Sequence, residues 1–88
     1  MDAVVLDGSV VDGNAIGGLL IEVFGTEMTT AVATCGSCGA ASQVAELPVY
    51  EHGLGTVVRC RSCAAMLMTF VRIRGVVCVD LEGLTSLE

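Results

Sequence analysis

Two Cys-x-x-Cys motifs constrain this chain more than any other feature of its sequence. They are Cys35-Gly-Ser-Cys38 and Cys60-Arg-Ser-Cys63, and 21 residues separate them. Two cysteines three positions apart on a tight turn direct both sulfur atoms at one point, and backbone N–H groups of the turn face the thiolates. With 21 residues between the motifs, the chain can run out, turn and return. The spacing therefore predicts one tetrahedral metal site, with Cys35, Cys38, Cys60 and Cys63 as ligands.

The donor set favours zinc as the occupant of this site. Four thiolates around Zn²⁺ form the closed shell of a structural centre and leave no position for a catalytic water. Iron, as in rubredoxin, is the alternative occupant, because tetrahedral sulfur sites accept either metal. Rubredoxins usually have proline and glycine in both turns and an aromatic-rich core, whereas this chain has one proline and three aromatic residues. We predict one zinc ion per chain.

Composition limits the class of protein further. The 88 residues, 53% of them hydrophobic, allow one small core. Glycine interrupts the longest uncharged stretches, so no segment supplies the roughly 20 apolar residues of a membrane span. The acidic start Met1-Asp2-Ala3 is unlike a secretory signal. Five cysteines, an odd number, argue against a disulfide framework. We therefore expect a cytoplasmic protein that does not enter membranes.

The charge distribution bears on the choice of partner. A net charge of −6 disfavours binding to nucleic-acid phosphates. All the basic residues are arginines, and no acidic residue lies among them: Arg59, Arg61, Arg72 and Arg74. We expect this local positive strip to balance the cysteine thiolates and to lie on a solvated strand face. Contact with a phosphate group or an acidic partner is the alternative.

One amphipathic helix is predicted over residues 13–24. Asp12 stands where an N-cap is expected, and Gly25 supplies the stop. Between them the apolar residues recur at helical spacing: Ile16, Leu19, Leu20, Val23 and Phe24. Gly17 borders this apolar face, so we expect close packing of the helix against a sheet.

The rest of the chain alternates turn signals with short runs rich in β-branched residues, and five strands are predicted: Thr30–Thr34, Val44–Tyr50, Thr56–Arg59, Leu67–Ile73 and Val76–Leu81. Pro48 indicates that the second of these is an edge strand, because proline offers no N–H to a neighbour. Residues 1–11 contain Asp7-Gly8 between apolar runs and are predicted to form an N-terminal arm or a short hairpin.

The cysteine motifs resemble those of the zinc-ribbon superfamily. Together with the segments Asp12–Met28, Val57–Cys63 and Asp80–Glu88, they are similar to a family of small bacterial proteins of unknown function. This resemblance implies a single domain over residues 12–88, with a zinc ribbon at residues 30–81 and the four cysteines as ligands. In fold class, we expect an α+β protein whose N-terminal helix packs on a small antiparallel β zinc ribbon. Ala64 follows the second motif where Gly39 follows the first, and alanine fits such a turn less well.

Two further residues have chemistry that invites a functional interpretation. Cys78 lies in an apolar run, where we expect it in the core as a small hydrophobic residue; a redox partner or an intermolecular disulfide is the alternative. His52, the single histidine, is expected on an exposed loop. With one histidine and no suitably spaced pair of carboxylates, we expect no enzymatic activity.

The function that best agrees with these features is a non-enzymatic interaction module that binds a protein partner or forms a homo-oligomer. Three alternatives remain at this point. They are a rubredoxin-like electron carrier, a thiol switch that releases zinc on oxidation, and a transcription or translation accessory factor that binds nucleic acid or its machinery.

Overall fold

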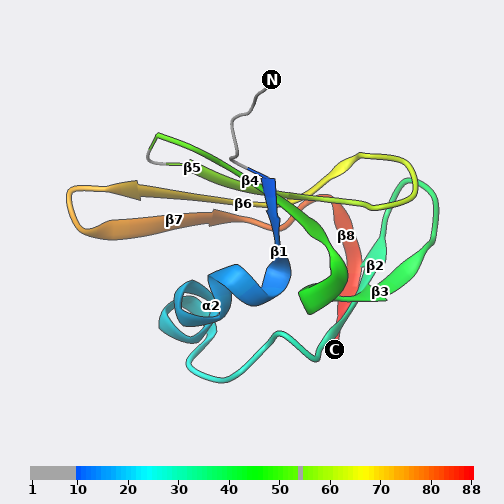
Figure 1. Cartoon of the computed structure of the whole chain (residues 1–88), viewed down its shortest axis with the longest axis horizontal. Coiled ribbons are helices and arrows are strands. Elements are labelled where there is room, and N and C mark those ends of the chain that lie inside the picture. Colours follow the sequence, from blue (N-terminus) through cyan, green and yellow to red (C-terminus); the bar gives the residue numbers. More distant parts are fainter. Residues whose placement is uncertain (1–9, 54) are drawn as a thin grey trace.

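A computed structural model describes residues 10–53 and 55–88, which form eight strands in two antiparallel sheets (Figure 1). The larger sheet has the strand order β1 (Val10–Asp12), β4 (Pro48–His52), β5 (Gly55–Arg59), β6 (Met66–Ile73) and β7 (Val76–Asp80). The smaller sheet has the order β3 (Ala41–Gln43), β2 (Val32–Cys35) and β8 (Leu84–Leu87). The predicted α+β class with antiparallel pairing is therefore confirmed.

The predicted helix is present and changes its winding along its length. It begins as the 3₁₀ turn η1 (Gly13–Ile16) and continues as α2 (Gly17–Phe24). Asp12 caps η1 by accepting a hydrogen bond from the Asn14 N–H at 3.1 Å. Gly25 ends α2 in the left-handed conformation, with φ of 77°. Within residues 10–53 and 55–88, no helix combines the length and the apolar character needed to cross a membrane.

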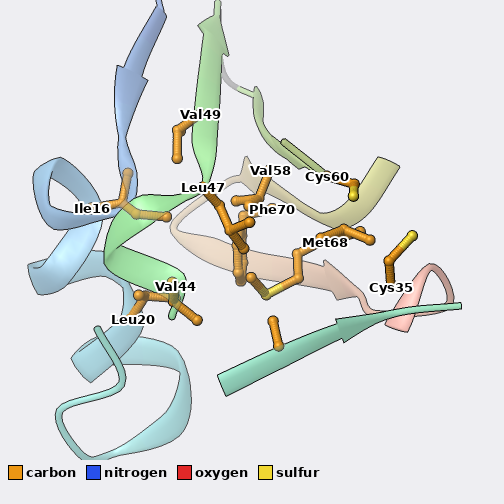
Figure 2. Packing of buried hydrophobic residues seen from close by; sticks show 12 residues of the cluster. Ile16, Leu20, Cys35, Val44, Leu47, Val49, Val58, Cys60, Met68 and Phe70 are labelled. Carbon is orange, nitrogen blue, oxygen red and sulfur yellow. The ribbon is translucent and has the colours of Figure 1, made fainter. Parts of the chain in front are cut away.

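The core lies between the helix and the two sheets. Ile16 and Leu20 point into it from η1 and α2, and Figure 2 shows them at one end of the buried cluster. Cys35 and Cys60 lie at the other end, so the cysteine site continues the core. The remaining buried hydrophobic residues of this cluster are Ala33, Val44, Leu47, Val49, Val58, Leu67, Met68 and Phe70.

The predicted strand over residues 44–50 is only partly correct. Its first part is the 3₁₀ turn η2 (Val44–Glu46), which packs beside η1, and β4 begins at Pro48. The expected edge position of Pro48 is wrong, because β4 lies between β1 and β5. Proline is accepted there because it is the first residue of β4, and the ladder with β5 begins one residue later, at Val49.

The expected burial of Cys78 is also wrong. Cys78 is exposed, because β7 is the last strand of the larger sheet and no further element covers its outer face in the part of the chain that the structure describes. An all-apolar run gives no alternation from which the buried face could be predicted. Of the predicted N-terminal arm or hairpin, residues 1–9 lie outside the described residues, and Val10–Asp12 form β1 along β4.

The close helix packing occurs at a different glycine from the one expected. A Cβ added at Gly17 would make only an ordinary contact with Thr29, at 3.6 Å. Gly13 is the tight position, because a Cβ there would overlap the Val44 carbonyl group of η2. The two 3₁₀ turns therefore meet backbone to backbone at Gly13.

Candidate metal centre

The two cysteine motifs form turns with the same backbone hydrogen bonds. In the segment Cys35–Ala40, the Cys35 N–H donates to the Ala40 carbonyl at 2.9 Å, and the Gly39 N–H donates to the Cys35 carbonyl at 3.0 Å. In Cys60–Ala65, the equivalent distances are 2.8 Å to Ala65 and 2.9 Å from Ala64. We call these segments the first and second knuckles. The first joins β2 to β3, and the second joins β5 to β6.

The knuckles place their sulfur atoms in one cluster. The sulfur atoms of Cys35, Cys38, Cys60 and Cys63 all lie within 4.8 Å of one another. Two pairs across the knuckles are closer, with Cys35 Sγ to Cys63 Sγ at 3.7 Å and Cys38 Sγ to Cys60 Sγ at 3.6 Å. A tetrahedron of thiolates with Zn–S bonds of 2.3 Å has edges of about 3.8 Å. The four cysteines are thus positioned to hold a metal ion.

Backbone N–H groups face the first sulfur of each knuckle. The Ser37 N–H and the Cys38 N–H lie 3.3 and 3.5 Å from Cys35 Sγ. In the second knuckle the Ser62 N–H lies 3.3 Å from Cys60 Sγ. These donors stabilise negative charge on sulfur, as the turns of the sequence motif predict.

The same donors make two of the thiols acidic. The N–H groups of Cys38 and Ser37 lower the pKa of the Cys35 thiol. Those of Cys63 and Ser62 lower the pKa of the Cys60 thiol to about 6, so this sulfur is largely a thiolate at neutral pH. Thiolate is the form that binds a metal ion.

Cys38 shows the opposite shift. The Ala40 N–H acts to lower its pKa, but the neighbouring sulfurs of Cys60, Cys63 and Cys35 together with desolvation outweigh it and raise the pKa to about 12. The cause is the closeness of the sulfurs, since thiolates within 4 Å of one another repel. A bound cation removes this penalty, so the cluster gains most when it is loaded with metal.

Gly83 lies between the first knuckle and the start of β6, and it contacts both. Its carbonyl accepts a hydrogen bond from the Gly36 N–H of the first knuckle at 2.9 Å. On its other side, the start of β6 approaches so closely that a Cβ on Gly83 would overlap the Met66 carbonyl oxygen and lie 2.7 Å from Leu67 Cα. Met66 directly follows the second knuckle. Sequence reasoning missed this role, because Glu82-Gly83 looks like an ordinary turn before a short tail.

The four arginines separate into two pairs. Arg59 and Arg61 flank Cys60, whereas Arg72 and Arg74 lie at the far end of β6, a distance of about 20 Å along the strand. Arg59 Nη1 donates to the Ala64 carbonyl at 2.8 Å, and its guanidinium lies 5.6 Å from the centre of the Tyr50 ring. The Arg59 side chain therefore stabilises the second knuckle through its hydrogen bond to Ala64. The expected role in charge balance did not predict this contact.

Two other arginines form ion pairs within the chain. Arg61 lies 3.5 Å from the Glu46 carboxylate. Arg72 makes a two-point contact with Glu22, at 2.8 and 3.0 Å, that joins β6 to α2. The Arg72 hydrogen bonds lower the pKa of Glu22. Both ion pairs are half exposed, so each contributes little to stability.

The fifth residue of each knuckle has a left-handed backbone conformation, and substitution at this position tests the geometry of the turn. Gly39 has φ of 79° and Ala64 has φ of 66°, so alanine adopts at the second knuckle the conformation that glycine adopts at the first. An L-residue with a side chain pays about 1 kcal/mol for this conformation. We expect Ala64→Gly to raise the free energy of unfolding by a few tenths to about 1 kcal/mol.

Gly39→Ala is the matched variant for this test. A Cβ at Gly39 meets no atom within 4 Å, so the substitution adds backbone strain without a clash. We expect it to lower stability by about 1 kcal/mol. Urea denaturation of the metal-loaded protein measures both changes. Loss of stability in Ala64→Gly would contradict the left-handed geometry of the second knuckle.

Fold and site together define a small α+β protein in which two β-turns from different sheets present four cysteines in metal-binding geometry. The chain belongs to DUF6510, a family of unknown function, whose family model matches residues 7–88. Comparison with curated proteins and with solved structures found no match.

Proposed function

We propose that the four cysteines bind one zinc ion with a structural role, and that the protein is a non-enzymatic zinc-ribbon module that binds another protein chain. The observation that carries the metal assignment is the clustering of four sulfurs within 4.8 Å on two turns of matching hydrogen-bond pattern. Four thiolates satisfy the tetrahedral preference of Zn²⁺ completely. A closed shell has no position for a substrate or a catalytic water.

The position of the site supports a structural role for the ion. Cys35 ends β2 of the smaller sheet, and Cys60 follows β5 of the larger sheet. An ion held by both knuckles links the two sheets at the end of the core where Cys35 and Cys60 are buried (Figure 2). A chain of this size has a small core, so metal binding supplies free energy that packing does not.

The surface supports the second half of the proposal, the binding of a protein chain. Several large hydrophobic side chains are exposed on the larger sheet, among them Val10, Tyr50, Ile73 and Val76. In the register of the sheet these four lie on one face, opposite the face that carries buried Phe70. Exposed apolar side chains gathered on one face are typical of protein interaction surfaces.

Elemental analysis and a visible absorption spectrum of tag-free protein, purified without added metal, test the metal assignment. We expect one zinc per chain and no visible band, because Zn²⁺ has a filled d shell. One iron per chain with thiolate charge-transfer bands would overturn the assignment and favour electron transfer. Protein that holds no metal and unfolds identically with and without added zinc would overturn the structural role.

A further inference from the structure

Among residues 10–53 and 55–88, no strand pairs with the outer edge of β7, which is an open edge of the larger sheet. Strand β7 pairs with β6 on one side, and the strand order ends with it on the other. Val76 is 63% exposed and Val79 is 39% exposed, and Cys78 between them is exposed too. Proteins usually protect such edges with charged residues, proline or a bulge. Residues 76–79 of β7 contain none of these.

The turn before β7 fixes which backbone groups face outward. Arg74 and Gly75 have φ of 53° and 80°, the signature of a two-residue type I′ hairpin. In such a hairpin the flanking residues, Ile73 and Val76, form a hydrogen-bonded pair, and this direction alternates along the strand. Val76, Cys78 and Asp80 therefore direct their N–H and C=O groups at β6. Val77 and Val79 direct theirs at the open edge.

We propose that β7 pairs antiparallel with β7 of a second copy of this chain, about a two-fold axis at Cys78. This inference rests on the proposed protein-binding function and names the partner. The outward backbone groups of Val77 then bond those of the partner's Val79, and the reverse pair forms by symmetry. The two larger sheets join into one antiparallel sheet. Of the two-fold registers that satisfy the outward groups, this one pairs all five residues of β7.

The side chains are self-complementary in this register. Cys78 lies opposite the partner's Cys78 in a non-hydrogen-bonded pair, where the Cα atoms are about 4.5 Å apart. Val76 lies opposite the partner's Asp80. Arg74, in the turn two residues before Val76, lies at the same end of the junction as this aspartate, because antiparallel pairing brings the start of one β7 beside the end of the other. Each junction thus brings an arginine of one copy near an aspartate of the other, twice by symmetry.

The face of the larger sheet that carries α2 also leaves room for a second strand beside β7. An open groove runs between α2 and β7, lined by Glu22, Val23, Val77 and Val79. A two-fold axis through paired edge strands stands perpendicular to the sheet, so both α2 helices lie on the same side of the joined sheet. The Val77 and Val79 side chains of the two copies then stack beside one another along this groove. Apolar surface that is exposed in one chain becomes buried in the pair.

The mass of the metal-loaded protein by light scattering across a range of concentrations tests the proposal. We expect the wild-type protein to have twice the mass of the 9.0 kDa chain. Val76→Asp places two carboxylates opposite each other at both ends of the junction and should weaken the dimer at least ten-fold. Val76→Lys, at the same exposed position, should form ion pairs with the partner's Asp80 and keep the dimer.

Disulfide formation at Cys78 tests the register. With oxidised glutathione, the two Cys78 thiols lose two electrons and two protons to form one disulfide, and one glutathione disulfide is reduced to two molecules of glutathione. Only a pair centred on Cys78 sets the two thiols directly opposite. We expect a covalent dimer in the wild-type protein. Cys78→Ser should keep the dimer mass and lose the covalent bond, which excludes crosslinking through the metal-site cysteines.

Three outcomes would overturn the proposal. They are a monomeric wild-type protein at hundreds of micromolar, equal dimerisation of Val76→Asp and Val76→Lys, and a dimer without a Cys78 disulfide. Zinc content measured on the same samples separates this proposal from the metal assignment. A folded monomer with one zinc per chain overturns the β7 interface alone, whereas a dimer without zinc overturns the metal assignment alone.

Discussion

Cys60→Ser should leave a chain that has no cooperative thermal unfolding transition, and a strong chelator should do the same to the wild-type protein. Cys60 is 4% exposed and belongs to both the core and the metal site. Serine is not a zinc ligand of this class, so the site loses its fourth sulfur. Structural zinc sites contribute roughly 10–16 kcal/mol of apparent binding free energy. That is as large as or larger than the whole stability expected for a chain of this length, about 4–13 kcal/mol.

Cys78→Ser is the matched control for this prediction. Cys78 is exposed and does not belong to the sulfur cluster, so its replacement should change the free energy of unfolding by less than about 0.5 kcal/mol. Circular dichroism during heating, with and without chelator, measures both variants. If Cys60→Ser melted at the wild-type temperature, the ion would be dispensable for folding.

The second large effect is expected at Gly83. An added Cβ at this position overlaps the Met66 carbonyl oxygen, and backbone atoms cannot move aside as a flexible side chain would. Gly83→Ala must therefore displace either β6 or the hydrogen bond from Gly36 to Gly83, which links this segment to the first knuckle. We expect a loss of about 3 kcal/mol or more in urea denaturation of the zinc-loaded protein, and weaker retention of zinc against a chelator.

Gly18→Ala shows whether the effect is specific to position 83. A Cβ at Gly18 meets no atom within 4 Å, and alanine favours the helix there by up to about 1 kcal/mol. We therefore expect this variant to be more stable than the wild-type protein. Equal losses at both positions would mean that the close contact at Gly83 does not govern the stability of the site.

The cluster of four cysteines could be predicted because much of its geometry is local. Each pair of cysteines lies on one turn, so a spacing of three residues already directs both sulfurs to one side. The helix was predictable for the same reason, since Asp12, the apolar spacing and Gly25 all act within a few turns. In the structure the predicted segment is a 3₁₀ turn over Gly13–Ile16 and an α-helix over Gly17–Phe24, and the four sulfurs lie together.

The errors concern pairing between distant parts of the chain. Pro48 suggested an edge strand, yet β1 covers the outer side of β4. Cys78 suggested a core position, yet β7 is the strand left at the edge. Strands β3 and β8 were missed because three or four residues carry too little periodicity to be recognised. The position of each strand in a sheet depends on the strand with which it pairs. The sequence of one strand does not identify that partner.

The sequence by itself thus determined the four candidate cysteines, the turns that hold them and the helix, because these depend on residues close together in the chain. The tertiary structure alone decided that the two knuckles belong to different sheets and that Gly83 lies between the first knuckle and the start of β6. It also decided which strand is left open at the edge of the larger sheet. These features arise from contacts between residues far apart in the chain, and such contacts form only when the whole core packs.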